Sequence, residues 1–408
     1  MRANYIILIL LLISNIPIVN ATGETHPSER FGHKMLYDPI NDRVLLFGGV
    51  LYDNSRETRY NDLWSYDFES EIWLEITSGS RPSPRNSFAW VYLEGHNQIL
   101  LYGGDTNQGK SSETWIYDLT ENRWFCVDSE LEQRPPRLSE ITIAYDSIND
   151  KVILFGGMGE NSPGSRDQTY NELWVFSFEP LSWTRRSPDN NPLPQYGAQM
   201  VYDEASSSVL MYPGHWNEVD DPTHHGYGDD IWEYQYQSDS WVMYEASSKP
   251  VGRYWANVNS VGAGKIILFG GNRATSMDDT WVYDYPSNTW SQIHTQNTPP
   301  DRMCSSMAYD PTNDQLVMFG GFQEGMVFLD DTWIFDFETE NWLELGEATD
   351  MSDSESEQSI PGYSYCSIFL GSLSYIIVKK LESKKYTVSC NKDIHFSQNR
   401  VPENSWKL

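Results

Sequence analysis

The feature that most constrains this chain is a repeated pair of tryptophans, the two members always nine positions apart. The six pairs are Trp64/Trp73, Trp115/Trp124, Trp174/Trp183, Trp232/Trp241, Trp281/Trp290 and Trp333/Trp342. They recur about every 50 residues and contain twelve of the sixteen tryptophans. Self-similarity at such a period predicts one structural unit that is repeated and packed against its neighbours.

Two further landmarks precede each pair. A glycine doublet ends an apolar run at Gly48-Gly49, Gly103-Gly104, Gly156-Gly157, Gly270-Gly271 and Gly320-Gly321, with Pro213-Gly214 in the fourth copy. An arginine stands 17 to 19 residues upstream of the doublet, at Arg30, Arg85, Arg137, Arg253 and Arg302, with Gln195 in the fourth copy. Short β-rich runs bounded by Asp, Asn, Pro and Gly predict four antiparallel strands per copy, here termed a to d.

Sheets with aromatic residues on both faces need cover, and the chain offers no helical pattern to supply it. Packing the six copies around an axis solves this, so the fold class is all-β, a six-bladed β-propeller. Because every copy runs from strand a to strand d, no strand exchange between the first and last blades is expected, and the sequence leaves the closure of the ring open.

The glycine doublet, the second tryptophan and the Tyr-Asp after the first tryptophan resemble kelch repeats; this dipeptide is Tyr66-Asp67, Tyr117-Asp118 and Tyr283-Asp284. The resemblance implies a six-bladed kelch propeller over residues 29–346, with blades at about 29–79, 80–131, 132–188, 189–247, 248–296 and 297–346. Departures are Phe176-Ser177, Tyr234-Gln235 and Phe335-Asp336, and the fourth copy also lacks the doublet.

The ends of the chain predict export and anchoring. Arg2, the apolar run 5–13 and Ala21 fit a signal peptide over residues 1–21, with an uncleaved anchor as the alternative, followed by a leader at 22–28. Residues 347–359 form an acidic, serine-rich spacer. Residues 360–378 carry no charge and are long enough for a transmembrane helix, or for a buried element of the domain, and 379–408 form a basic cytoplasmic tail.

The tripeptide Pro361-Gly362-Tyr363 resembles that of archaeal surface sorting signals, which implies cell-surface anchoring with possible replacement of the helix by a lipid. The 23 residues after Lys385 depart from such signals. The net charge of −30 excludes a main role in binding nucleic acid. Four cysteines without a C-x-x-C pair exclude a disulfide framework and a zinc ribbon.

The b-to-c and d-to-a connections of all blades should open on one rim, and there the loops vary in length. Aromatic rings that can stack on a ligand and arginines that can bind carboxylates predict a ligand groove on this rim. Its candidate residues are Arg30, Arg85, Arg137, Arg253, Arg302, Tyr196, Tyr254, Trp255 and Trp216, with loop arginines Arg56, Arg59, Arg166 and Arg273. The equal alternative is that the recurring arginines join neighbouring blades and the aromatics close the channel.

The longest loop, 215–230, brings imidazoles and carboxylates together, as divalent cations require. The candidate ligands are His215, His224, His225, Asp220 and Asp221; a solvated polar loop is the alternative because the spacing matches no defined site. No cofactor other than such a cation is expected.

No hydrolase elbow, P-loop or dinucleotide fingerprint is present. A copper oxidase resembling galactose oxidase is disfavoured because the rim histidines cluster in one loop and Cys126 lies in an outer strand. We therefore predict an exported, membrane-anchored binding or adhesion module for a protein or glycan, without catalysis. The alternative is a carbohydrate-active kelch enzyme resembling a sugar-acid mutarotase.

Overall fold

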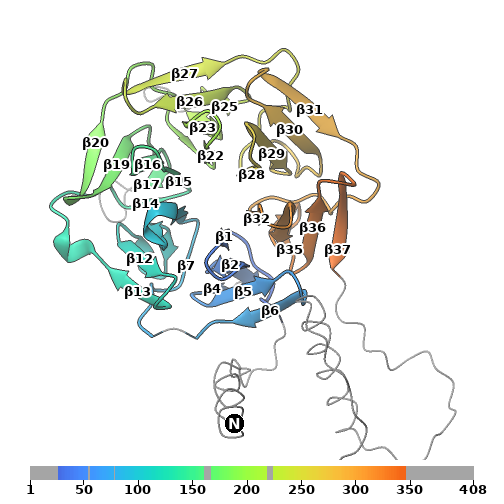
Figure 1. The fold of residues 1–408 in the computed structure, drawn as a ribbon, viewed down its shortest axis with the longest axis horizontal. Helices are drawn as coiled ribbons and strands as arrows, with labels where there is room; N and C mark the ends of the chain where they lie inside the picture. The colour runs from blue at the N-terminus through green and yellow to red at the C-terminus, as the bar shows by residue number, and fades with distance from the viewer. Residues whose placement is uncertain (1–25, 54–55, 78, 160–166, 218–223, 346–408) are drawn as a thin grey trace, which may run out of the picture. The chain divides into compact units, whose positions relative to one another are not determined.

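The computed structural model describes residues 26–53, 56–77, 79–159, 167–217 and 224–345. Within them, six four-stranded antiparallel sheets surround a central axis (Figure 1). The expected all-β propeller is therefore observed. The predicted signal peptide, spacer, apolar segment 360–378 and basic tail lie outside the described residues. None of the helices within those residues is both long and apolar enough to cross a membrane.

Each blade consists of four strands from one copy of the repeat, in the order a, b, c, d from the axis outwards. Strands a are β1 (Lys34–Asp38), β8 (Ala89–Leu93), β15 (Thr142–Asp146), β22 (Gln199–Asp203), β28 (Asn257–Ser260) and β32 (Ser306–Asp310). Strands b are β2 (Arg43–Phe47), β9 (Gln98–Tyr102), β16 (Lys151–Phe155), β23 (Ser208–Tyr212), β29 (Lys265–Phe269) and β33 (Gln315–Phe319). Strands c are β5 (Leu63–Asp67), β12 (Thr114–Asp118), β19 (Leu173–Phe178), β26 (Ile231–Gln235), β30 (Thr280–Asp284) and β36 (Thr332–Asp336). Strands d are β6 (Ile72–Glu75), β13 (Arg123–Cys126), β20 (Leu181–Arg186), β27 (Ser240–Tyr244), β31 (Thr289–Ile293) and β37 (Asn341–Leu345).

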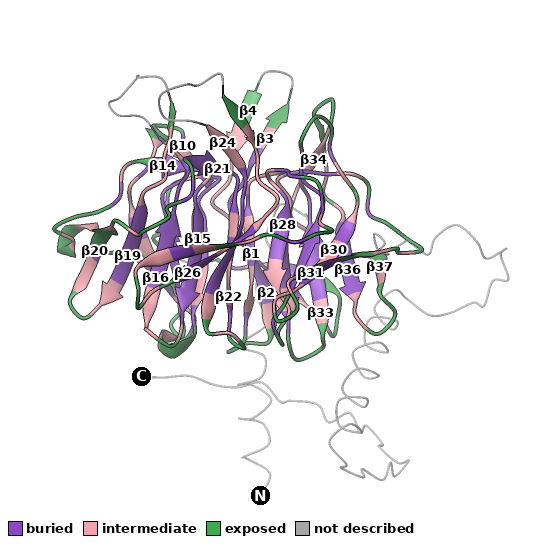
Figure 2. Ribbon diagram, turned by 90° about the horizontal axis from the view of Figure 1, so that it is seen from above, coloured by how far each residue is buried: buried purple, intermediate pink, exposed green. Residues whose placement is uncertain are grey.

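Short strands in the b-to-c connections rise from one rim, which we call the loop rim (Figure 2). They are β3 (Val50–Asp53), β4 (Arg56–Arg59), β10 (Asp105–Thr106), β11 (Gly109–Lys110), β17 (Met158–Gly159), β18 (Gln168–Thr169), β24 (His215–Asn217), β25 (His225–Tyr227), β34 (Phe322–Gln323) and β35 (Val327–Phe328). Three of these pairs gain a third strand from the segment before strand a. The third strand is β7 (Arg85–Asn86) for β10–β11, β14 (Leu138–Ser139) for β17–β18, and β21 (Gln195–Tyr196) for β24–β25. Two 3₁₀ turns, η1 (Glu94–His96) and η2 (Asp128–Glu130), complete the described elements. The fourth blade is a regular sheet despite Pro213-Gly214.

The second tryptophan of each pair fills the wedge between two blades. Trp183 of blade three lies with its ring 5.4 Å from Tyr102, the last residue of strand b in blade two. The same contact recurs around the ring: Trp73–Phe319, Trp124–Phe47, Trp241–Phe155, Trp290–Tyr212 and Trp342–Phe269. All six indoles are at most 5% exposed. Repetition of one aromatic contact therefore sets the angle between neighbouring blades.

Three of these six indoles find a hydrogen-bond acceptor on the preceding blade, and the first residue of strand c decides which. Trp183 Nε1 donates to Thr114 Oγ1 at 3.1 Å, Trp73 to Thr332 and Trp342 to Thr280, both at 3.0 Å. Where Leu63, Leu173 or Ile231 holds this position, the Nε1 atoms of Trp124, Trp241 and Trp290 have no partner among the described residues.

Replacing Thr114 by valine should lower the free energy of unfolding by about 1–3 kcal/mol, because a buried indole N–H is then left without an acceptor. Equilibrium denaturation in urea measures the change. Leu173→Val is the matched control, because Trp241 already lacks an acceptor there. An equal loss in both variants would contradict the assigned hydrogen bond.

A closed ring of six backbone hydrogen bonds surrounds the axis at the loop rim. Each member donates its N–H to the carbonyl of the preceding blade's member, at 2.8 to 3.3 Å. The members are Gly32, Ser87, Glu140, Gly197, Trp255 and Cys304, and all six have positive φ, between 53° and 66°. This conformation is unfavourable for the four non-glycine members, so the ring of hydrogen bonds holds them in it.

The ring closes between blades six and one through the segment that precedes strand a of blade one. Gly321 N donates to Arg30 O at 2.9 Å, and Gly32 N donates to Cys304 O at 2.9 Å. Met35 N also donates to Ser306 Oγ at 2.8 Å. Each of the two sheets at this junction takes its four strands from one copy of the repeat, as the sequence predicts. Backbone bonds and the Trp73 wedge therefore latch the propeller without strand exchange.

Candidate functional site

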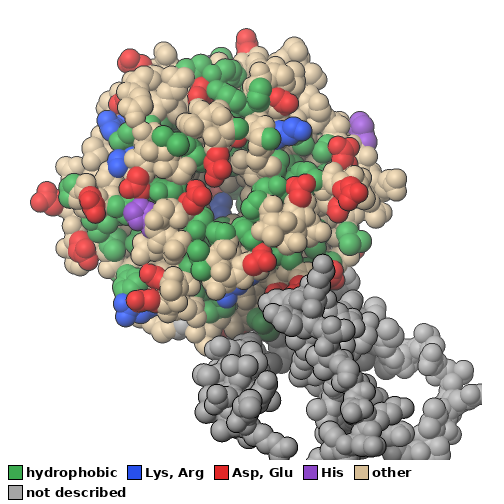
Figure 3. Space-filling model, in the orientation of Figure 1, with side chains coloured by type: hydrophobic (Ala, Val, Ile, Leu, Met, Phe, Trp, Pro, Cys, Tyr) green, Lys and Arg blue, Asp and Glu red, His purple; other side chains and the backbone are tan. Residues whose placement is uncertain are grey.

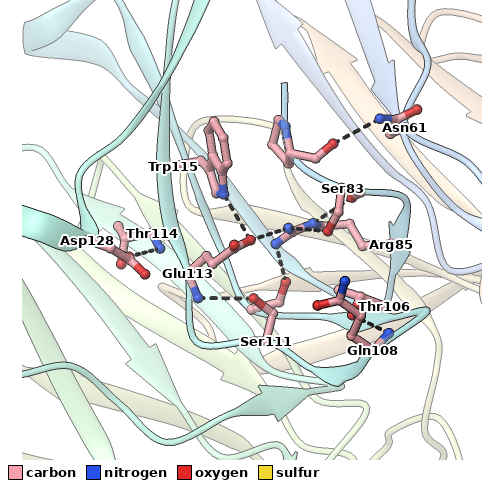
Figure 4. Close-up of polar contacts among 12 residues, drawn as sticks. Asn61, Ser83, Arg85, Thr106, Gln108, Ser111, Glu113, Thr114, Trp115 and Asp128 are labelled. Atoms are coloured by element: carbon pink, nitrogen blue, oxygen red, sulfur yellow. Dashed lines mark hydrogen bonds and ion pairs between the residues drawn. The ribbon is translucent and has the colours of Figure 1, made fainter. Parts of the chain in front are cut away.

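Four of the recurring arginines lie inside the blades. Arg85 donates to Gly103 O at 2.9 Å, to Ser83 O and Oγ, both at 3.0 Å, and to Glu113 Oε2 at 2.5 Å (Figure 4). Trp115 Nε1 donates to the same carboxylate at 3.1 Å. Although burial alone would raise the pKa of Glu113, the hydrogen bonds from Arg85 and Trp115 lower it. The network fixes the b-to-c connection to the start of strand a.

The other three arginines repeat this arrangement in blades one, five and six. The ion pairs are Arg30–Asp62, Arg253–Asp279 and Arg302–Asp331, and all four guanidinium groups are at most 1% exposed. Their prediction as open groove residues is therefore corrected, because intramolecular partners use the charge. The alternative, that these arginines join neighbouring blades, is corrected in part, because their side chains bond within one blade. Their backbone carbonyls do reach the neighbouring blade: Gly49 N donates to Arg85 O at 2.9 Å.

Arg137 does not belong to this set. It is exposed, and the next residue, Leu138, occupies the buried position in blade three. The carbonyl of Leu138 accepts from Gly104 N at 2.8 Å, as the carbonyl of Arg85 does from Gly49. The sequence alignment is therefore shifted by one residue in this blade, and its Glu172 pairs instead with Arg185 at 3.0 Å.

The structure brings three predicted site residues, Tyr196, Tyr254 and Trp255, into one partly exposed cluster on the loop rim. Ring centroids lie 4.2 Å apart for Tyr254 and Trp255, and 5.8 Å apart for Tyr196 and Tyr254. His215 and Tyr227 of the blade-four hairpin β24–β25 complete it, with Tyr227 5.6 Å from Tyr254. We call these five residues the aromatic shelf. Burial raises the pKa of Tyr196 to about 12, so the hydroxyl stays neutral.

A second aromatic cluster on the same rim spans the junction of blades six and one. It contains Phe31, Tyr52, Phe322 and Phe328, with ring centroids of Phe31 4.8 Å from Phe322 and 5.6 Å from Phe328. The sequence analysis did not identify Tyr52, Phe322 and Phe328 as site residues, and it also missed Tyr227. Their common signal is an aromatic residue in a b-to-c hairpin.

The loop arginines differ in setting. Arg273 is exposed, and its guanidinium lies 5.8 Å from the ring centre of Tyr227, at the edge of the shelf. Arg59 pairs with Glu57 at 2.6 Å and donates to Asn86 at 3.0 Å. Arg56 is exposed in β4, and Arg166 lies outside the described residues. Arg273 is therefore the cation best placed to act together with the aromatic shelf.

The predicted metal ligands form no group of three among the described residues. His215 Nε2 and His225 Nδ1 lie 3.2 Å apart, and His224 contacts Trp216 with ring centroids 5.6 Å apart. Asp220 and Asp221 lie outside the described residues. Burial and the neighbouring His225 lower the pKa of His215, which favours a neutral ring stacked in the shelf. Cation binding by this loop stays a prediction.

Titratable groups also gather beneath the ring of backbone hydrogen bonds. Glu140 accepts from Trp255 Nε1 at 2.6 Å and from Ser87 Oγ at 2.9 Å, and burial raises its pKa. Burial lowers the pKa of Lys34, opposed by the charge of Glu140. His33 is 1% exposed, both its ring nitrogens lack a partner among the described residues, and burial lowers its pKa well below the usual range.

His33 makes stability depend on pH. Its folded-state pKa lies below the unfolded value of 6.5, so the unfolded chain binds the proton more readily, and stability is lost as the pH falls below 6.5. One such group accounts for a loss of up to about 2 kcal/mol between pH 6.5 and 5. Blade two has Phe88 at this position. His33→Phe should therefore make the free energy of unfolding, measured in urea, less dependent on pH between pH 6.5 and 5. An unchanged slope would assign the dependence to other groups.

The arrangement offers little to the enzymatic alternative. The four buried arginines are engaged in ion pairs, and a sugar-acid mutarotase would need such groups free for a substrate carboxylate. Cys126 is an exposed free thiol in strand d, while burial raises the pKa of the Cys304 thiol well above its usual range. Stacking and edge contacts on the loop rim are what this geometry provides.

Comparison with known proteins agrees with the architecture. The profile of the KLHDC2/KLHL20/DRC7 Kelch-repeats domain matches residues 13–184 and 142–365, which together exceed half of the chain. The chain belongs to the kelch-repeat family. Kelch repeats are typical of protein-interaction modules, so this kelch propeller is assigned to that broad class.

Similar regions occur in proteins of different overall organisation. The kelch propeller is 30% identical over 197 residues to the leucine-zipper-like transcriptional regulator 1 homolog of Drosophila melanogaster, covering 45% of this chain and 19% of that protein. It is 28% identical over 164 residues to the flagellar outer arm dynein alpha chain of Chlamydomonas reinhardtii, covering 40% and 3% respectively. For multiple epidermal growth factor-like domains protein 8 of Mus musculus the identity is 24% over 198 residues, covering 45% and 6%. The matched region thus spans less than a fifth of each of these relatives.

Proposed function

We propose that this kelch propeller is an exported, membrane-anchored module that binds a protein partner through the aromatic shelf of its loop rim, without catalysis. The observation that carries the proposal is the convergence of four aromatic residues and His215 at one place on that rim, with exposed Arg273 beside them. Partly exposed aromatic rings with a neighbouring arginine are the residue types that dominate the energetics of protein interfaces.

The shelf suits binding because its own rings support one another. The Tyr254 ring contacts all four other members of the shelf, so it is held in place before any ligand arrives. Trp255 is fixed further by its hydrogen bond to Glu140. Little side-chain entropy is then lost on binding, which increases the affinity per contact.

The shelf is tested with a random displayed-peptide library panned against the purified full chain. Peptides that bind should lose at least about tenfold in affinity on Tyr254→Ala, as expected when an interface aromatic is removed. Tyr309→Ala on the opposite rim is the matched control, and thermal melting checks that both variants fold. Peptides that bind Tyr254→Ala as tightly as the wild type would refute the shelf as the site.

A glycan array probed with the same proteins separates the two ligand classes. If a sugar binds, if Trp255→Ala abolishes that binding, and if no peptide is enriched, the ligand is a glycan rather than a protein. Turnover of a sugar acid, followed by NMR of its anomers, would instead favour the enzymatic alternative.

Export and anchoring are supported by the charge and hydropathy pattern of residues 1–21 and 360–408. Mass spectrometry of the mature protein should find a new N-terminus at Thr22. The protein should stay in the membrane fraction after alkaline washing, and deletion of residues 360–378 should release it. Retention of the deletion variant in membranes would contradict anchoring by this segment.

A further inference from the structure

The six innermost strands enclose a channel of about 800 Å³ along the propeller axis. Its lining includes Pro39, Glu94, Ser147, Glu204 and Pro311 of the a-to-b hairpins, so it reaches the rim opposite the aromatic shelf. Figure 3 views that rim and shows a central hollow surrounded by apolar and acidic side chains. The volume falls in the range of about 300–1,000 Å³ that is usual for small-molecule sites.

The channel wall is layered because the strands a are aligned in register. The second layer is apolar throughout: Met35, Trp90, Ile143, Met200, Val258 and Met307. The third layer is Leu36, Val91, Ala144, Val201 and Ala308, with Asn259 as its single polar side chain. The fourth layer, nearest the hairpin rim, is Tyr37, Tyr92, Tyr145, Tyr202 and Tyr309, with Ser260 in blade five. The outer part of the channel is therefore apolar and aromatic.

The inner end of the channel is polar and carries one cation. The first layer is Lys34, Ala89, Thr142, Gln199, Asn257 and Ser306. Beyond it lies a cavity of about 30 Å³, enclosed by the members of the hydrogen-bond ring and lined by Lys34, Glu140 and Cys304. Lys34 borders both spaces.

The side-chain ammonium group of Lys34 has no hydrogen bond or ion pair to any other described residue. The nearby Glu140 carboxylate is already used by Trp255 and Ser87. A partly buried ammonium group without a partner is unfavourable, and an anion placed beside it from the channel would gain a charge-assisted hydrogen bond.

We propose that this channel binds one elongated molecule with an apolar body and a single terminal carboxylate, a fatty-acid-like ligand whose carboxylate reaches Lys34. The apolar body then covers the second to fourth layers, which are three residues of each strand and therefore span roughly 10 Å. An alkyl chain gives up no hydrogen bond to water when it enters this part of the channel, because it has no polar group.

A peptide occupant fits less well. Its amides would lose their hydrogen bonds to water in layers two and three, where Asn259 is the single polar side chain of the wall. The backbone edge of strand a compensates poorly, since Met35 N and Met200 N already donate to Ser306 and Thr142 of the preceding blades. The chemistry of the wall therefore selects a lipid-like acid over a peptide.

The test is isothermal titration of the full chain, kept in detergent-free amphipol, with dodecanoate below its micelle concentration. Saturable binding at one site per chain is expected, with dodecanol and dodecyltrimethylammonium each at least about tenfold weaker. Lys34→Met should abolish the preference for the acid over the alcohol. Lys265→Met, an exposed lysine just after the a-to-b hairpin of blade five, is the matched control and should bind as the wild type does.

Two further variants keep the outcome clear. Ser260→Trp narrows the mouth far from Lys34 and should weaken acid and alcohol alike. Glu140→Gln should leave dodecanoate binding unchanged or tighten it, since a nearby negative charge is removed. Equal affinity for acid and alcohol, wild-type affinity in Lys34→Met, or no saturable binding up to the solubility limit would each overturn the proposal. Tyr254→Ala should bind dodecanoate normally, so this result is independent of the shelf.

Discussion

Trp183→Ala is expected to lower the free energy of unfolding by about 3–5 kcal/mol, the usual cost of deleting a buried aromatic ring. The Trp183 ring is 1% exposed, lies between blades two and three, and contacts Tyr102 and Phe176 at centroid distances of 5.4 and 5.0 Å. Its removal leaves a cavity that two adjoining sheets cannot close without moving apart, and it also leaves Thr114 without its donor. Urea denaturation followed by circular dichroism measures the loss.

The first tryptophan of the same pair is the natural comparison. Trp174 lies in strand c of the same blade, 8% exposed, with its Nε1 bonded to Glu172 at 2.9 Å rather than to another blade. Trp174 packs in the same apolar core as Leu93 and Tyr102 of blade two but makes no hydrogen bond to that blade, so limited proteolysis between blades two and three should increase more in Trp183→Ala than in Trp174→Ala. Equal cleavage in both variants would refute the wedge role.

Asp331→Ala is expected to cost about 3–5 kcal/mol, because it leaves the fully buried guanidinium of Arg302 without its counter-charge. The pair is bidentate, at 2.6 and 2.7 Å, and Asp331 also accepts from Trp333 Nε1 at 2.7 Å. Thermal and urea denaturation of the variant give the change in stability.

A double-mutant cycle distinguishes this charge effect from lost packing. The double variant Arg302→Leu/Asp331→Ala should lose less free energy of unfolding than the sum of the losses in the two single variants, because no unpaired charge remains. Blade three provides the precedent, since Leu138 naturally occupies the arginine position. Removing the exposed pair Arg123–Glu121, 59% exposed on both sides, should change stability by less than about 0.5 kcal/mol. Additivity in the cycle would contradict the buried ion pair.

The repeat pattern of the sequence was sufficient to predict the architecture, because each landmark has a strictly local cause. A glycine doublet ends strand b where the chain needs positive φ, and where a side chain at Gly48 would clash with the Arg85 carbonyl at 2.7 Å. The nine-residue spacing puts the two tryptophans of each pair on adjacent antiparallel strands. The first therefore lies in strand c and the second in strand d, farther from the axis. The shelf residues Tyr196, Tyr254 and Trp255 were predictable for the same reason, since they directly precede strand a in two copies of the repeat.

What the sequence by itself determined is therefore the six-fold repeat, the strand order and the rim that carries the aromatic residues. Tertiary structure alone decided the burial of four arginines, the one-residue shift from Arg137 to Leu138, and the closed ring of backbone hydrogen bonds through Glu140, Trp255 and Cys304. It also decided the apolar channel with Lys34 at its inner end. These features depend on partners in other blades or on the far side of a connection, and periodicity within one copy of the repeat carries no information about them.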